Sequence, residues 1–162
     1  MFQFENLIQT GMASANLVEQ NRESINAVFD SLNDALDRET QGLITIERVT
    51  MKPSNLVNSI KTYDMAIKGL EPLLSIEGKQ DNGILQIVLS DGDGCSASVA
   101  RWEQHSDGYP FTIEFLGERT DCWDQEALVS ILGKIVSSGQ FWLKVKELQS
   151  RAQKGSEKKQ PT

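Results

Sequence analysis

The chain offers few groups of neighbouring side chains that could do acid–base or nucleophilic chemistry together. The only histidine is His105, which is followed directly by Ser106 and Asp107. A Ser-His-Asp relay needs groups that meet in space, which three neighbours in one turn do not do. We therefore interpret His105 as a solvent-exposed turn residue.

Four carboxylates lie on either side of the end of the strand predicted at 110–116. They are Glu114, Glu118, Asp121 and Asp124. Acidic groups at a strand end can act as general acids and bases or hold a divalent cation. These four alternate with Arg119 and lead into a helix start, where acidic groups are stabilised by the helix dipole. The pattern favours a structural role, and a metal-dependent enzyme that uses these carboxylates is the alternative.

The loop at 91–94, with sequence DGDG, is the one stretch that resembles a calcium or phosphate loop. An EF-hand loop needs an oxygen ligand at its fifth position, glycine at the sixth and glutamate at the twelfth. Counted from the first aspartate, these positions hold Cys95, Ser96 and Trp102. No GxxxxGK[ST] or GxGxxG pattern occurs either. We therefore predict a hairpin turn here, and a protein that is not an enzyme and has no catalytic, cofactor or metal site.

The first forty residues read as one long amphipathic helix that organises the rest of the chain. Its apolar residues recur in steps that alternate between four and three, which is typical of a helix seam that packs along another helix. We assign self-association to this seam, whose apolar members are Phe4, Ile8, Ala15, Val18, Ile25, Phe29, Leu32 and Leu36.

Gly11 and Arg22 interrupt the apolar seam. Extra apolar residues beside it, such as Leu7, widen the apolar face, so we expect the helix to be shared between its own sheet and a second subunit. Arg22 would then lie at the rim of that interface, or pair with an acid of a neighbouring chain such as Glu19 or Glu23.

The region 42–117 reads as mainly β with one helix near 54–68. A strand is predicted at 43–51, with a bulge near Glu47 and Arg48 where the apolar alternation changes phase. Ser54 is a good N-cap for the helix, although the alternation after residue 62 would also suit a strand. Further strands, separated by Gly, Asp and Asn clusters that suit tight turns, are predicted at 73–77, 84–89, 95–103 and 110–116.

The region 123–152 returns to helix, interrupted near residues 137–139. Trp142 follows Phe141 directly, so the two rings point to different faces and Trp142 is a candidate exposed contact. Residues 153–162 are polar and predict a disordered tail. The fold class is therefore a single α+β domain over 1–152, with a long N-terminal helix, an antiparallel sheet of about five strands and C-terminal helices packed on one face.

The charge of the chain is unevenly distributed. The formal net charge is −7, with eight acids and three bases in residues 1–50, but seven bases and two acids from residue 134 onward. An acidic protein repels nucleic-acid phosphates, so contact with nucleic acid through the basic C-terminal segment is the weaker alternative. The acidic surface suits a basic protein partner, as in adaptor, chaperone, inhibitor or immunity proteins.

The chain shows no sign of membrane insertion or export. No window approaches the about 18 continuous apolar residues of a membrane span, and the start lacks the features of a signal peptide. We expect a cytoplasmic homo-oligomer without membrane contact. Cys95 and Cys122 would there be free thiols, and a disulfide between them is left open.

Overall fold

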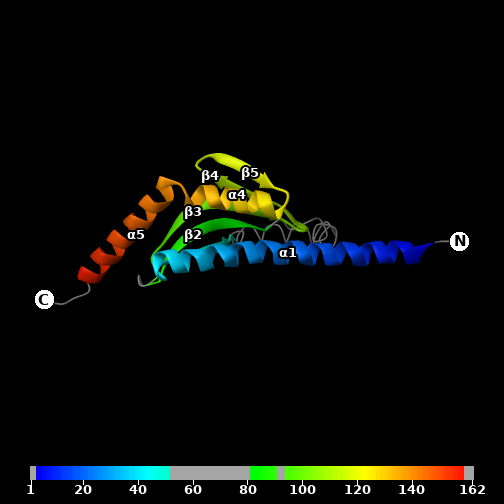
Figure 1. The fold of residues 1–162 in the computed structure, drawn as a ribbon, viewed down its shortest axis with the longest axis horizontal. Helices are drawn as coiled ribbons and strands as arrows, with labels where there is room; N and C mark the ends of the chain where they lie inside the picture. Colours follow the sequence, from blue (N-terminus) through cyan, green and yellow to red (C-terminus); the bar gives the residue numbers. More distant parts are fainter. Residues whose placement is uncertain (1–2, 52–80, 91–93, 159–162) are drawn as a thin grey trace, which may run out of the picture.

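The computed structural model describes residues 3–51, 81–90 and 94–158. These residues form an α+β fold with one long helix, a five-stranded sheet and two C-terminal helices (Figure 1). The predicted helix at 54–68 and the predicted strand at 73–77 lie outside the described residues. The elements are α1 (Phe4–Thr40), β1 (Ile44–Thr50), β2 (Asp81–Leu89), β3 (Ser96–His105), β4 (Gly108–Phe115), β5 (Glu118–Cys122), α4 (Gln125–Val136) and α5 (Gly139–Lys158).

The sheet is an antiparallel meander in which strands adjacent in sequence are adjacent in space, in the order β1-β2-β3-β4-β5. This confirms the predicted arrangement. β5 is a strand that the sequence pattern does not predict, because its residues, ERTDC, are mostly charged or polar. It forms because Leu116 and Gly117 both have positive φ, at 51° and 81°, which closes a two-residue hairpin back onto β4.

β1 contains no bulge, contrary to the prediction. Its pairing with β2 is continuous along all seven residues, and the irregularities in the sheet lie between β2 and β3 and between β3 and β4 instead. The apolar alternation changes phase because Arg48 takes a core-facing position after Ile44 and Ile46. Its guanidinium stands 4.4 Å from the ring centroid of Phe29 and donates to Asn26 Oδ1 at 2.7 Å. A stacked arginine thus replaces an apolar side chain at this position.

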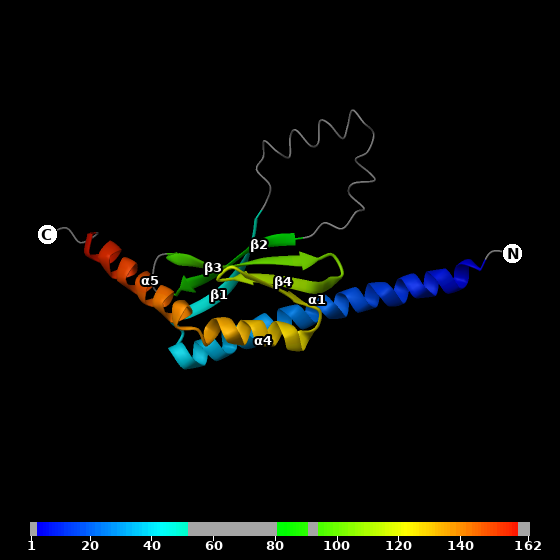
Figure 2. The same ribbon diagram turned by 90° about the horizontal axis from the view of Figure 1, so that it is seen from above.

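The three helices of the described residues lie against one face of the sheet (Figure 2). α1 crosses under β1 and β4 and contacts α4, while α5 packs against β2 and β3. The core between these layers includes the rings of Phe29, Phe111 and Trp102. The Phe111 ring centroid lies 5.7 Å from that of Phe29 and 5.7 Å from that of Trp102. Leu128 and Phe141 from the last two helices are fully buried in the same core.

The outer edge of β1 is covered at its middle by one side chain of α1. Asn33 accepts a hydrogen bond from Ile46 N–H at 2.8 Å and donates one to the Ile46 carbonyl at 3.0 Å. The amide therefore occupies the hydrogen-bonding groups that a further strand would use.

The C-terminal region differs from the prediction in two respects. α5 continues to Lys158, so residues 153–158 are helical, although a disordered tail was predicted from residue 153. Extending a helix costs less than starting one, which lets a polar segment continue a packed helix. Trp142 is also half-buried rather than exposed, because its indole N–H donates to the Val136 carbonyl at 2.8 Å. Trp123 is the exposed tryptophan, with 70% of its surface accessible.

Candidate functional site

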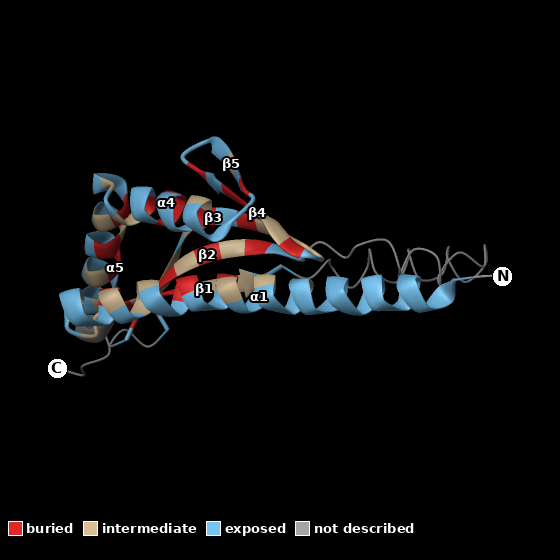
Figure 3. Ribbon diagram, turned by 45° about the vertical axis from the view of Figure 1, so that its right-hand side comes forward, coloured by how far each residue is buried: buried red, intermediate tan, exposed pale blue. Residues whose placement is uncertain are grey.

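α1 consists of two segments with different surroundings. From Asn21 onward it lies against the sheet and α4, whereas residues 3–20, which we call the arm, extend past the sheet (Figures 1 and 3). All arm residues are exposed except Val18, which is half-buried. At about 1.5 Å per residue the arm is roughly 27 Å long. It is thus a helical projection whose side chains, apart from Val18, are exposed.

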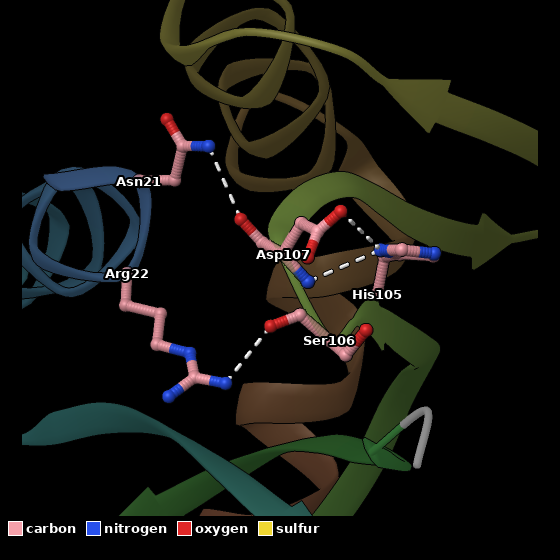
Figure 4. Close-up of polar contacts among 5 residues, drawn as sticks. All are labelled: Asn21, Arg22, His105, Ser106 and Asp107. Carbon is pink, nitrogen blue, oxygen red and sulfur yellow. Dashed lines mark hydrogen bonds and ion pairs between the residues drawn. The ribbon is translucent and has the colours of Figure 1, made fainter. Parts of the chain in front are cut away.

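The arm leaves the domain just before Asn21, where the turn between β3 and β4 contacts α1 (Figure 4). Asn21 Nδ2 donates to the Asp107 carbonyl at 3.1 Å, and Arg22 Nη2 donates to the Ser106 carbonyl at 2.8 Å. Arg22 therefore binds its own domain through this contact, which the sequence does not predict, and its place at the rim of an interface stays a prediction. Backbone carbonyls of a turn are good acceptors for a guanidinium, and a sequence pattern gives no sign of such a contact.

The same turn approaches α1 closely at Gly108. This glycine has a φ of 97°, and a Cβ added to it would lie 2.7 Å from Asn21 Cβ. The next residue, Tyr109, shares a hydrogen bond with Ser24 at 2.9 Å between the two hydroxyl oxygens. We call Asn21, Arg22 and Ser24, with the turn that they contact, the clamp. The clamp fixes the direction in which the arm leaves the domain.

His105 has a local structural role beside the clamp. Its Nδ1 accepts a hydrogen bond from the Asp107 N–H at 3.1 Å, which assigns the ring proton of a neutral imidazole to Nε2. Asp107 Oδ2 lies 3.7 Å from the same Nδ1 (Figure 4). The Ser106 carbonyl is taken by Arg22, so these three neighbours build a turn and not a relay.

The arm carries a set of large apolar side chains that are mostly exposed. The exposed fractions are 61% for Phe4, 67% for Leu7, 59% for Ile8 and 65% for Met12. At about 100° per residue these four and Ala15 fall on one side of the helix. An apolar side of this kind on a projecting helix is typical of a surface that binds another protein.

The structure divides the predicted seam between the arm and the core. In the arm, Phe4, Ile8 and Ala15 are exposed and Val18 is half-buried. The four later members point into their own domain, where Ile25, Phe29 and Leu36 are buried and Leu32 is partly buried. Only the first four are therefore left for a second subunit. Leu7, which the sequence pattern already places beside the seam, and Met12 flank the seam on the arm, and Met12 could have been found from the helical angle.

Acidic side chains follow one side of α1 beyond the apolar part of the arm. We call this set the acidic stripe; its members are Glu19, Glu23, Asp30, Asp34 and Asp37. Steps of four, seven, four and three residues keep them within one sector of the helix, and each is exposed. The sector is continuous with the apolar side of the arm.

The four carboxylates near β5 do not converge. Glu118 pairs with Lys134 at 3.0 Å, Asp121 accepts from the Thr112 hydroxyl at 2.8 Å, and Asp124 caps α4. Glu114 is exposed on the same face of the sheet as Thr112, beside a hollow of about 440 Å³ that both residues line. Among the described residues, no group of three or more His, Cys, Asp or Glu side chains is placed to hold a metal ion.

Both cysteines are free thiols, and they differ in burial. Cys95 is half-buried, whereas Cys122 is fully buried. Burial is the main cause that raises the pKa of Cys122 from its ordinary value of 9.0 to about 11, with smaller contributions from Asp121 and Asp124. A thiol with a raised pKa is a poor nucleophile near neutral pH.

Comparisons of the chain with protein-family models, curated proteins and solved structures find no match. Among the described helices, none is both long and apolar enough to cross a membrane. Function therefore has to be inferred from the arm, the clamp and the acidic stripe.

Proposed function

We propose that this protein is a non-enzymatic interaction module that self-associates through the arm of α1 and binds a basic segment of another protein. The observation that carries the proposal is the apolar side of the arm, which the clamp holds away from the domain's own core. The proposed module is of the adaptor, chaperone, inhibitor or immunity type, whose members act by binding another protein and not by catalysis.

Self-association is energetically reasonable for an arm of this size. Leu7, Ile8 and Met12 each have more than half of their surface exposed, as does Phe4. Burial of such side chains yields about 1–2 kcal/mol each. Two arms together would thus gain on the order of 10 kcal/mol, which exceeds the lower part of the about 4–15 kcal/mol that association costs. Added polar contacts would give a dimer that dissociates on dilution.

The charge of the arm favours a protein over a membrane surface as its partner. Residues 3–20 include Glu5 and Glu19 and no lysine or arginine. Helices that lie on membranes usually carry basic residues along their polar side, because membrane lipids are often anionic. Because the arm has two acidic residues and no basic one, it is not attracted to anionic lipids. Packing against another helix needs only contact between apolar side chains.

The acidic stripe supports the second part of the proposal. Its five carboxylates are exposed in one sector of α1, so a basic segment lying along the helix would meet several of them at once. Complementary charge of this kind speeds association and selects partners, and it weakens as salt is added. We therefore expect binding of the basic partner to weaken as the ionic strength increases.

The arm can be tested with two double variants that add the same charge. Ile8→Asp with Met12→Asp places two carboxylates on the apolar side, and Asn6→Asp with Gln9→Asp places two on the polar side. All four positions are exposed, so both variants should keep the circular dichroism spectrum of the unchanged protein. Light scattering should give a monomer for the first and a dimer for the second. A dimer that persists in the first variant would show that the arm is not the interface.

A further inference from the structure

We propose that the arm packs against the arm of a second copy in antiparallel orientation, with the two-fold axis passing at Gly11. This inference rests on the self-association proposed above and specifies its partner and geometry. Three features of the arm support it: its length relative to the clamp, the small residues at its middle and the distribution of its charges.

The length of the arm fits an antiparallel pair. With the axis at Gly11, Phe4 of one copy lies level with Val18 of the other, and Gln3 lies level with Glu19. The second helix therefore ends just before Asn21, where the turn between β3 and β4 covers α1. A register shifted further toward the domain would drive the partner's first turn into Ser106. A register shifted the other way would leave apolar side chains uncovered.

The middle of the arm allows two helices to approach closely. Among the described residues, a Cβ added to Gly11 would find no atom within 4 Å outside its chain neighbours and the nearby backbone of its own helix, so this side of the helix can admit a close neighbour. Ala15, one turn further, is also small, while Leu7 and Ile8 lie on either side of Gly11 at about 100° per residue. Helix axes approach to about 8–10 Å depending on the side chains at the crossing, and small residues permit the shorter distance. The crossing also gives a structural reason for a glycine that costs about 1 kcal/mol relative to alanine within a helix.

The charges distinguish antiparallel from parallel pairing. A parallel pair in register would place Glu5 near Glu5 of the second copy and Glu19 near Glu19, which is repulsive. An antiparallel pair brings Glu19 instead to the partner's first helical turn, whose N–H groups carry partial positive charge. Gln3, the N-cap, makes no side-chain capping hydrogen bond there. Antiparallel helix dipoles add to this preference.

Engineered cysteines can separate the two orientations. The background is Cys95→Ala, and Cys122 is retained because it is fully buried. Three single variants are made in it: Phe4→Cys, Gly11→Cys and Val18→Cys. Each is oxidised alone, and the first and third are also oxidised as an equimolar mixture. Covalent dimers are quantified on non-reducing gels, and the mass of each reduced variant is measured by sedimentation.

The proposal expects a covalent dimer from Gly11→Cys alone and from the mixture of Phe4→Cys and Val18→Cys, but not from either of those alone. Cross-linking of Phe4→Cys and of Val18→Cys each with itself would overturn the antiparallel geometry and leave self-association through the arm intact. A dimer in sedimentation without any of these cross-links would overturn both the geometry and the arm as interface. A monomeric unchanged protein would overturn the proposed self-association itself.

Discussion

Arg22 Nη2 donates to the backbone carbonyl of Ser106 at 2.8 Å, which joins the first helix to a turn 84 residues later in the chain. This contact marks the boundary between the part of α1 that belongs to the core and the part that projects. Asn21, its neighbour, bonds the next carbonyl of the same turn. This boundary matters for function because, within α1, the large exposed apolar side chains all lie before it.

Replacing Gly108 with alanine should weaken the clamp. The residue has a φ of 97°, and its new Cβ would lie 2.7 Å from Asn21 Cβ. We expect a loss of about 2–4 kcal/mol in the free energy of unfolding, from backbone strain and this clash together. Gly117→Ala is the matched control, since Gly117 has a φ of 81° and, among the described residues other than its chain neighbours, no atom within 4 Å of an added Cβ. Urea denaturation should show the larger loss for Gly108→Ala, and equal losses would mean that the close approach is unimportant.

Aspartate at Ile25 and Phe29 should unfold the domain, unlike aspartate in the arm. These two residues have 0% and 4% of their surface exposed. A carboxylate there would be buried without a partner, in addition to the loss of apolar contacts, for a cost above about 4 kcal/mol per site. Far-ultraviolet circular dichroism should show loss of structure. A folded variant with unchanged mass would refute the placement of this half of α1 in the core.

Asn33→Ala should destabilise the domain and uncover the edge of the sheet. The substitution removes both hydrogen bonds between Asn33 and Ile46. The backbone N–H and carbonyl of Ile46 can then bond to water or to another strand. We expect a loss of about 1–3 kcal/mol and faster aggregation on warming. Asn16→Ala in the exposed arm is the control, and it should change neither property. Aggregation can be followed by light scattering; equal rates for the two variants would remove the edge-covering role of Asn33.

Cys122 should make stability fall at alkaline pH. Its pKa is raised from 9.0 to about 11 in the folded protein. The unfolded chain therefore releases the thiol proton first, so stability is complete below pH 9 and is lost as pH rises toward 11. The slope in this window is at most about 1.4 kcal/mol per pH unit. Denaturation at several pH values should show a steeper decline for the unchanged protein than for Cys122→Ala; parallel declines would contradict the assignment.

The sequence was sufficient for the elements whose signals are local. The long helix shows a sustained period and few breakers, and the strands of the meander are separated by Gly, Asp and Asn turns. β5 was missed because its strand state depends on pairing with β4 across a hairpin and not on its own residues. The helical end of α5 was missed because packing earlier in that helix supports a polar extension.

The candidate site could be only partly predicted. The apolar period of α1 is the same before and after Arg22, so nothing in the pattern shows that Ile8 is exposed and Ile25 is buried. That difference arises from where the sheet and the β3–β4 turn end in space. The bulge predicted near Arg48 failed for a related reason, since an arginine stacked on Phe29 can occupy a core-facing position.

Sedimentation equilibrium of the unmodified protein tests the central claim most directly. Apolar burial and polar contacts between the two arms are together expected to give a monomer–dimer equilibrium with a dissociation constant on the order of micromolar, which corresponds to a net association free energy of about −8 kcal/mol. The mean mass should therefore rise from that of the 18.0 kDa chain toward twice that value as concentration increases through this range. A constant mass of one chain up to tens of micromolar, roughly tenfold above that constant, would contradict self-association through the arm.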